Sequence, residues 1–376
     1  MDGVRTNLGM RRKARIRQAS LEDYDRISSL QLRNGLAAQP REDWEALRKT
    51  KPVCPQEAEC PIGWVLETAE AEIVGSVSSI PLAYRFRGRD LRVASVGDWA
   101  VDPPYRGYSM FLLSQAQTQR NVDLLISTTV NPISEAILRV LKWTPVPVGN
   151  WNRAAFLITA HHGFLKAVLA LKSIPFSRFV SYPCAAALFS VDRLRNLGTS
   201  FKGVRHDIEL CSGFDERFDA FWLELENGNP DALLAVRSQE SLAWHFRSRL
   251  LRGNIWILAV HKGCCMVGYA IFDRRDKPLL GLKRVRLVDF WALESPEEVF
   301  WSALEWMKDR CRREGIHMVE LIGWLGRPEI RRIRALHHRR LPSCLYYYKA
   351  QNAELGTALL DANAWRPSLF DGDASL

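Results

Sequence analysis

The sequence predicts a mixed α/β fold built from two similar units in tandem, the second of them degenerate. Runs typical of strands and of helices alternate along the whole chain, as in mixed α/β proteins. The 376 residues are enough for two domains. A glycine is followed by an aspartate twice at a similar offset: Gly75 precedes Asp98 by 23 residues, and Gly268 precedes Asp289 by 21. We interpret this echo as a diverged internal repeat; the alternative is two unrelated α/β domains with a common rhythm of elements.

The first half is predicted to run strand, helix, three strands, helix, strand, helix. A strand at 15–19 leads to Ser20 and Asp23, which are spaced as a capping box at the start of a helix. β-branched and aromatic residues predict the later strands, and apolar spacing predicts the later helices. The strands are expected at 64–67, 73–80, 91–101 and 122–130, and the helices at 110–120 and 133–143.

The second half is predicted to repeat this order, with strands at 208–211, 255–260, 266–272 and 284–293 and helices at 214–226 and after 293. Ser295 and Glu298 are spaced as a second capping box around Pro296. Ile330, Ile333 and Leu336 predict a basic helix with one apolar stripe within 327–340. The apolar segment 154–176 is expected to form a buried or interfacial helix, since basic and histidine residues interrupt it.

These elements divide the chain into five parts. We expect a basic flexible leader at 1–14, an N-terminal unit at 15–150 and an apolar helical connector at 151–203. A second, degenerate unit is expected at 204–350. The tail at 351–376 is expected to dock onto the fold through its large aromatic side chains.

Charge and cysteine content limit the function classes. The formal charge of +10 and the isoelectric point near 9.3 favour an anionic partner, such as a phosphorylated small molecule, an acidic glycan, a membrane surface or nucleic acid. The eight cysteines contain no CxxC pair and no Cys/His spacing suited to zinc. We therefore expect reduced thiols, no metal site and a cytoplasmic protein. The basic N-terminus lacks the apolar segment of a secretory signal.

The turn VDPPYRGYSMFLL at 101–113 carries the clearest functional pattern. It joins a strand to a helix, contains Arg106 and Gly107, and has no carboxylate beyond Asp102. A helix start without acidic residues favours an anion, an arginine can bind pyrophosphate through two N–H groups, and glycine lets the backbone approach a ligand. The matching turn of the second half carries three glutamates within 294–298, which would repel a phosphate. Only the first half is expected to bind one.

Two segments resemble the GCN5-related N-acyltransferases, namely VASVGDWAVDPPYRGYSMFLL at 93–113 and STTVNPISEAILRVLKW at 127–143. The resemblance covers about 15–148, with a fainter second copy over 204–349. It implies acetyl-CoA or another acyl-CoA as substrate, with transfer of the acyl group to an amine. By this resemblance the acyl-CoA contacts lie in the strand, the turn and the later helix start: Trp99, Ala100, Val101, Arg106, Gly107, Tyr108, Ser109, Met110 and Asn131. Asn131 is alternatively no more than the N-cap residue of its helix.

Asp98 is the candidate catalytic base. A carboxyl group inside an apolar strand has a raised pKa, which suits the removal of a proton from an amine. The alternative is a structural carboxylate, and Glu67 and Glu72 are the other candidate bases on nearby strands.

The sequence departs from the family pattern at three positions. Ser109 replaces a loop glycine, and Phe111 replaces the last residue of the loop and is expected to pack into the core. Leu138 stands where many members of the family carry a tyrosine that acts as general acid. Water is then expected to protonate the leaving thiolate.

The run RSQESLAWHF at 237–246 resembles a motif of tandem acyltransferase-like proteins of bacterial polysaccharide gene sets and of Fem-type transferases. This resemblance implies that the second copy shapes an acceptor cleft between the halves, with a small-molecule or glycan-linked amine as acceptor. No nucleic acid partner is expected. A peripheral membrane contact and the oligomeric state stay open. The alternatives are a binding or scaffold module without turnover, and a basic protein that binds an acidic glycan or a membrane surface with strong salt dependence.

Overall fold

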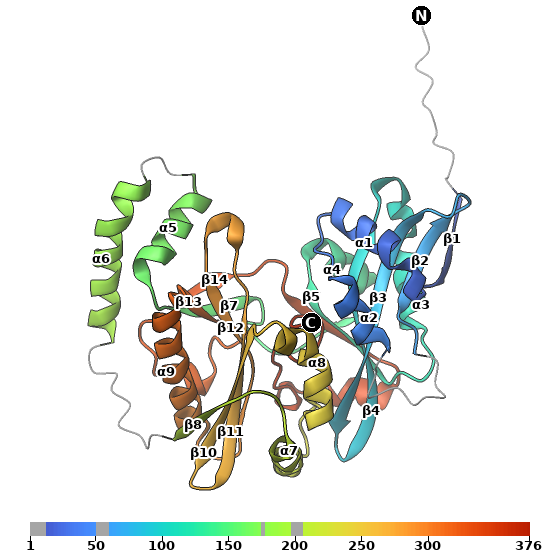
Figure 1. Cartoon of the computed structure of the whole chain (residues 1–376). Coiled ribbons are helices and arrows are strands. Elements are labelled where there is room, and N and C mark those ends of the chain that lie inside the picture. The colour runs from blue at the N-terminus through green and yellow to red at the C-terminus, as the bar shows by residue number, and fades with distance from the viewer. Residues whose placement is uncertain (1–12, 50–59, 174–176, 197–205) are drawn as a thin grey trace, which may run out of the picture.

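The computed structural model describes residues 13–49, 60–173, 177–196 and 206–376. Nearly all of the predicted leader lies outside these residues. Two twisted sheets stand side by side, each with helices against it, and the C-terminal end of the chain lies between them (Figure 1).

The first sheet has the strand order β1-β2-β3-β4-β5-β15-β6, and the short strand β9 pairs with the far end of β3. Neighbouring strands are antiparallel except β4 and β5, which are parallel. The strands are β1 (Ala14–Gln18), β2 (Gly63–Thr68), β3 (Ile73–Phe86), β4 (Arg89–Val101), β5 (Leu124–Val130), β6 (Thr144–Pro145), β9 (Leu234–Ala235) and β15 (Leu345–Ala350).

The second sheet, read from its other edge, has the order β8-β10-β11-β12-β13-β7-β14. Here β12 and β13 form the parallel pair, and the other neighbours are antiparallel. Seven strands of the first sheet thus have counterparts with the same relative directions in the second. The strands are β7 (Arg153–Ile158), β8 (Asp207–Cys211), β10 (Ile255–Lys262), β11 (Cys265–Arg274), β12 (Arg284–Ala292), β13 (Met318–Ile322) and β14 (His337–Arg340).

The glycine–aspartate echo marks equivalent places in the two sheets. Gly75 pairs with Val101 at the end of β4, and Gly268 pairs with Ala292 at the end of β12. Each aspartate of the echo lies three residues before that end. Both glycines are positions where a helix approaches the sheet closely, because a Cβ at Gly268 would lie 2.5 Å from Val299 and one at Gly75 would lie 3.4 Å from a leucine of the helix that follows β4.

The two sheets also exchange chain segments. β15 follows every strand of the second sheet in sequence, yet it lies in the first sheet between β5 and β6. Conversely, β7 follows directly after β6 of the first sheet in sequence, yet it lies in the second sheet, between β13 and β14. The predicted ranges assign 345–350 to the second unit and 153–158 to the connector. Local patterns do not report a strand partner two hundred residues away, so this exchange is not visible in them.

Helices cover both faces of the first sheet. α1 and α2 lie on one face, and α3 and α4 lie on the other. Successive side chains of β2 point to opposite faces, and they pack alternately against these two layers. Val65 packs with Ile27 of α1 and Trp44 of α2, whereas Leu66 packs with Leu112 of α3. The helices are α1 (Tyr24–Arg33), α2 (Arg41–Lys49), α3 (Ser109–Gln117), α4 (Pro132–Val140), α5 (His161–Leu171), α6 (Ser177–Arg195), α7 (Glu216–Gly228), α8 (Gln239–Leu251), α9 (Pro296–Glu314) and α10 (Ala353–Ala358).

The largest apolar core lies between the two sheets. It combines side chains from both sheets with α7, α8 and the C-terminal tail, whose Trp365 and Phe370 are buried in it. Arg237, directly before α8, is 1% exposed and donates hydrogen bonds to Asp289 of β12 and Asp371 of the tail. This buried ionic group ties the tail to the second sheet.

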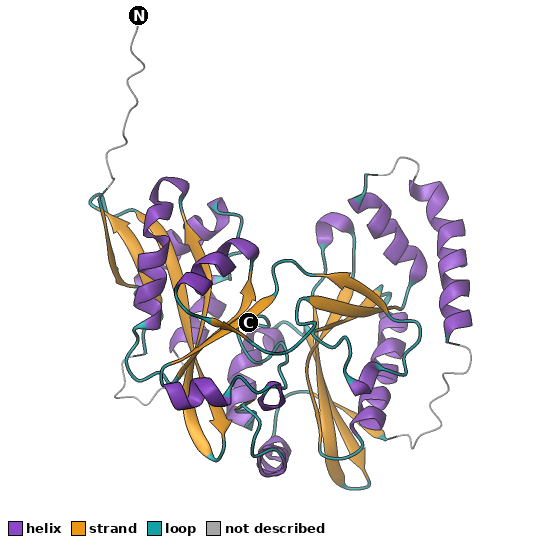
Figure 2. Ribbon diagram, turned by 180° about the vertical axis from the view of Figure 1, so that it is seen from behind, coloured by secondary structure: helices purple, strands orange, loops and turns teal. Residues whose placement is uncertain are grey.

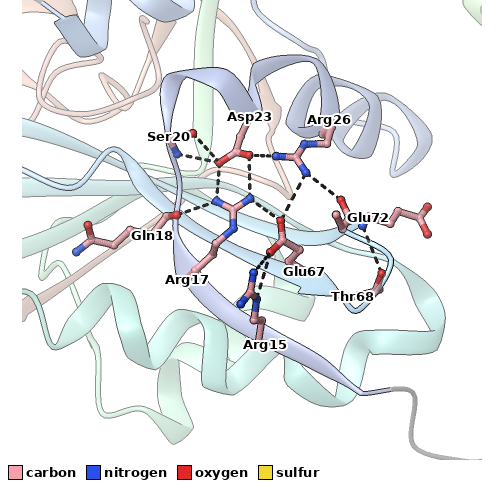
Figure 3. Close-up of polar contacts among 10 residues, drawn as sticks. Arg15, Arg17, Gln18, Ser20, Asp23, Arg26, Glu67, Thr68 and Glu72 are labelled. Carbon is pink, nitrogen blue, oxygen red and sulfur yellow. Dashed lines mark hydrogen bonds and ion pairs between the residues drawn. The ribbon is translucent and has the colours of Figure 1, made fainter.

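The predicted capping box is confirmed, at the 3-10 helix η1 (Leu21–Asp23) that leads into α1. The backbone N–H of Ser20 donates to Asp23 at 2.8 Å, and Asp23 also accepts hydrogen bonds from Arg17 and Arg26 (Figure 3). Arg17 continues to Glu67 of β2 at 2.8 Å. The contacts fasten the start of α1 to the edge of the sheet.

Several local expectations are wrong. Residues 327–340 form a short 3-10 turn, η4 (Pro328–Ile330), and strand β14 rather than a basic helix, because His337 to Arg340 pair with β7. The segment 154–176 begins with β7 before α5 starts. The side chain of Ser295 makes no cap at α9. Cys60 is disulfide-bonded, whereas six other cysteines are free thiols: Cys184, Cys211, Cys264, Cys265, Cys311 and Cys344.

Candidate active site

The first sheet splits between β4 and β5. Within the described chain the two strands pair only at residues 93–95 and 124–126, although β4 continues to Val101 and β5 to Val130. A bulge interrupts β4 just beyond this pairing. Asp98 and Trp99 together face the single residue Val77 of β3, and Asp98 has the left-handed φ of +46°. A bulge of this kind takes backbone N–H groups out of the ladder and turns a side chain toward a new direction.

The C-terminal tail enters the split. The carboxylate of Asp373 accepts hydrogen bonds from Thr128 at 2.5 Å and Thr129 at 2.9 Å, both on β5. On the β4 side it lies so close to Gly97 that a Cβ there would be 2.5 Å from Asp373 Oδ2. Asp373 therefore bridges the diverging strands, next to Asp98. No local sequence pattern indicates the position of Asp373, because Asp-Gly-Asp near a chain end is typical of any polar turn.

A cleft of about 540 Å³ lies over the two carboxylates. Its walls come from the segment between α1 and α2, from α2 itself, from α8 and from the tail, so that both halves of the chain contribute to it. Asp98 and Asp373 lie in its lining together with Gln39, Asp43, Trp244 and Arg247. Two lining atoms are buried and have no hydrogen-bond partner within the described residues, namely Gln39 Oε1 and Trp244 Nε1.

The environment of Asp98 favours its protonated form. Burial raises the pKa of its carboxyl group, the charge of Asp373 raises that pKa further, and the charge of Arg48 acts in the opposite direction. Arg48 is 5% exposed, and burial lowers its own pKa to about 10. A small cavity behind Asp98 is lined by Arg48 and Ser76, and Arg48 Nε and Ser76 Oγ have no partner among the residues described.

The equivalent aspartate of the second half has a different environment. Asp289 is fully buried, and it accepts hydrogen bonds from Arg237 at 2.8 Å and from the Tyr269 hydroxyl at 2.6 Å. A carboxylate neutralised in this way inside the core serves structure. Of the two equivalent positions, Asp98 alone borders the cleft.

The other candidate bases are less suited to proton transfer. Glu67 accepts hydrogen bonds from Arg17 and Arg15, which lower its pKa to about 2. It therefore holds a proton too weakly near neutral pH. Glu72 lies exposed at the turn between β2 and β3, outside the cleft lining (Figure 3).

The side chains of Ala100 and Val101 pack on opposite faces of the sheet, one toward α1 and α2 and the other toward α3. Only their backbone can face a ligand in the split. Trp99 is partly exposed, and its indole N–H is buried without a hydrogen-bond partner in the described part of the chain.

The turn after β4 is a 3-10 helix, η2 (Pro103–Tyr108), which leads directly into α3. Arg106 and Gly107 are exposed on it, and a Cβ at Gly107 would meet open space. The N–H of Ser109 donates to the carbonyl of Arg106, so this N–H is used within the turn. Neither η2 nor the first turn of α3 contains an acidic residue. Arg106 is the basic side chain in the last turn of η2, and it is exposed.

Exposed apolar side chains flank the start of α3 and α4. Met110 is 40% exposed and Phe111 59%, which corrects the expectation that Phe111 enters the core. The buried face of α3 is formed instead by Leu112 and its neighbours. Ile133 at the start of α4 is 81% exposed. Because β4 and β5 are parallel, both helices begin at the same edge of the sheet, beside the split.

Asn131 is the N-cap of α4, since its side chain accepts from the N–H groups of Ile133 and Ser134, both at 2.9 Å. Tyr108 lies partly buried against the core beneath α3. Leu138 is buried in that same core, and its hydrocarbon side chain cannot donate a proton. Tyr347 of the exchanged strand β15 donates its hydroxyl hydrogen to Glu135 in the first turn of α4, at 2.7 Å.

No protein-family model matches the sequence. No curated protein matches it either. Solved structures do, over nearly the whole chain. A GCN5-related N-acetyltransferase from Anabaena variabilis superposes with a TM-score of 0.55 at 12% identity, covering 90% of this chain and 73% of its own. This chain has the fold of the GCN5-related N-acetyltransferases.

Two further structures with this fold are similar to the chain. A conserved protein from Enterococcus faecalis, described as a probable N-acyltransferase, has a TM-score of 0.55 at 14% identity and covers 90% of this chain and 72% of its own. A GCN5-related N-acetyltransferase from Kribbella flavida has a TM-score of 0.52 at 13% identity, with 91% and 72% covered. The acetyltransferase fold therefore extends over both sheets.

Two general features of the chain complete the description. Within the described residues, no helix is both long and apolar enough to cross a bilayer. In the same residues, no three His, Cys, Asp or Glu side chains are arranged to hold a metal ion.

Proposed function

We propose that the chain is an acyl-CoA-dependent N-acyltransferase whose active site is the split in the first sheet. We propose further that the second sheet belongs to a degenerate copy of the same unit, which shapes the acceptor side. One observation carries this proposal. The bulge of β4, an aspartate with a raised pKa and the lining of a large cleft coincide at one point of the molecule.

The acyl-CoA is proposed to enter between β4 and β5 from the edge where α3 and α4 begin. Arg106 is the proposed partner of its phosphate groups, since the turn around it carries no acid. The exposed side chains of Met110, Phe111 and Ile133 offer apolar surface to the pantetheine arm. Backbone N–H groups at the bulge, near Asp98 and Trp99, are the proposed donors to the thioester carbonyl as negative charge develops on it.

The proposed reaction joins the amine nitrogen to the thioester carbon and breaks the carbon–sulfur bond. Asp98 removes the proton that the amine must lose, and its raised pKa brings it closer to the range in which a general base is effective. The thiolate leaves with the electron pair of the carbon–sulfur bond and takes a proton from water. The products are an amide and free CoA.

The acceptor is proposed to be a primary amine on a polar molecule. The cleft lining carries charges of both signs, among them Asp43, Asp98 and Asp373 on one hand and Arg247, Arg249, Arg252 and Arg275 on the other. We propose an amino sugar or an amino-acid-bearing precursor of a cell-surface polysaccharide as the acceptor, because it offers an amine to Asp98 and further polar groups to the charged side chains of the lining.

The test is acyl transfer followed by mass spectrometry, with acetyl-CoA and a panel of amino sugars and amino acid amides. Thiol reagents are unsuitable because Cys184, Cys264 and Cys265 are exposed. Wild-type protein is expected to form an acetylated amine, and Asp98→Asn is expected to slow this by about 10²–10⁴-fold. Asp90→Asn at the exposed end of the same strand is the matched control. Binding of acetyl-CoA without turnover on any amine would favour a binding module instead.

A further inference from the structure

Helices α5 and α6 form a hairpin at the outer edge of the molecule. Both views place α6 outermost, beyond α5 and far from the first sheet (Figures 1 and 2). α6 packs mainly against α5. The active-site proposal makes no use of this hairpin.

The outer surface of α6 is apolar. Ser181, Ala185 and Asp192 are the buried positions along it, and they mark the side that faces the protein. On the opposite side, Pro183, Ala187, Val191 and Leu194 recur at helical spacing and are all exposed, Val191 to 42% and Leu194 to 65%. Tyr182 and Phe189 are also exposed, but they lie on the flank next to α5, where their rings pack against His162 and His161. Apolar side chains gathered in this way on one helix indicate a surface that another phase or molecule covers.

The charge of the same hairpin is positive. Residues 161–195 contain five Lys and Arg and a single carboxylate, Asp192. Asp192 is 6% exposed and is held at 3.0 Å by His161 of α5 and at 3.0 Å by His337 of β14. The only carboxylate of the hairpin is thus turned inward, while Arg193 and Arg195 lie exposed beside Val191 and Leu194.

We infer that α6 docks on an anionic lipid surface, with its axis in the plane of the interface. An apolar helix face bordered by cations has the features of interfacial helices, in which apolar burial and attraction to acidic headgroups add together. No described helix is suited to cross the bilayer, so the contact is peripheral. A second copy fits this face less well, because two such hairpins would bring cations together without exposed carboxylates to pair them.

The test is co-sedimentation of the whole chain with vesicles. Phosphatidylcholine vesicles containing phosphatidylglycerol are compared with vesicles of pure phosphatidylcholine. The variants are Val191→Ser with Leu194→Ser, which removes apolar area, and Arg193→Glu with Arg195→Glu, which reverses charge. Leu223→Ser on α7 and Arg89→Glu at the start of β4 are the controls, since both positions are exposed and lie on elements outside the α5–α6 hairpin.

The wild type and both controls are expected to sediment with the acidic vesicles, and each α6 variant is expected to lose at least about tenfold in partition. Circular dichroism checks that the variants are folded. Absence of binding to acidic vesicles would overturn the inference, as would equal binding of the α6 variants and the wild type. A dimer in sedimentation velocity that dissociates on Val191→Ser with Leu194→Ser would assign the face to a second copy and overturn it too.

Discussion

Replacing Arg237 by Met should cost more stability than any exposed substitution in this chain. Arg237 is 1% exposed and holds two carboxylates of the core, Asp289 and Asp371, with N–O distances of 2.8 Å to each. Its guanidinium also donates to the carbonyl of Ala235 at 2.7 Å. Met fills a similar volume but removes the ion pairs and hydrogen bonds that Arg237 makes with both buried carboxylates.

Removal of one partner from a buried ion pair costs about 3–5 kcal/mol, and a whole domain has only about 5–15 kcal/mol of stability. Arg237→Met should therefore lower the unfolding free energy by about 3–5 kcal/mol. The exposed control Arg89→Met should change it by less than about 0.5 kcal/mol. Urea unfolding followed by tryptophan fluorescence and far-UV circular dichroism measures both.

The pH dependence of this loss is a second readout. Burial raises the pKa of Asp371, and Arg237 is the main group that opposes the rise. Without Arg237 the folded-state pKa moves further above the unfolded value, so stability is lost as pH rises toward the folded pKa. The penalty of Arg237→Met should be smaller at about pH 5 than at about pH 8. A loss below about 1 kcal/mol, or one that is the same at both pH values, would refute the assignment of this group as a buried ionic tie.

Three further outcomes follow from the site and the strand exchange. Asp373 raises the pKa of Asp98, so Asp373→Asn should shift the rise of the acyl-transfer rate with pH to lower pH. A pH–rate profile with an unchanged rise would show that Asp373 does not affect the titration of Asp98. Gly97→Ala places a Cβ 2.5 Å from Asp373 Oδ2 and should lower the melting temperature, whereas Gly107→Ala, where a Cβ meets open space, should leave it unchanged; equal melting temperatures would contradict the tail contact. A chain that ends at Arg340 lacks β15 and should aggregate rather than unfold cooperatively in circular dichroism, and a soluble folded product would show the exchanged strand to be dispensable.

Local sequence patterns predicted the strands around the split well. β3 and β4 are rich in β-branched and aromatic residues, and two prolines and a glycine predict the turn after β4. Gly75 and Gly268, which suggested a repeat in the sequence, both lie where a helix packs closely on its sheet. The N-cap role of Asn131 follows from its place before a proline.

The wrong predictions concern residues whose secondary structure or burial is determined by contacts with distant parts of the chain. Ile330, Ile333 and Leu336 have helical spacing, yet the pairing of β14 with β7 pulls the end of that run into a sheet. Phe111 looks like a core residue in sequence, but Leu112 takes the buried face of α3. The position of Asp373 in the split depends on a strand order that only the folded chain defines.

The central claim is that the first sheet binds an acyl-CoA through Arg106, and calorimetric titration with acetyl-CoA tests it most directly. Arg106→Ala is compared with Arg334→Ala, an exposed arginine of the second half. We predict saturable binding by the wild type and by Arg334→Ala, and a loss of at least about tenfold in affinity for Arg106→Ala, in line with one charge-assisted contact. Equal affinity in the two variants, or no binding of acetyl-CoA by the wild type, would contradict the account.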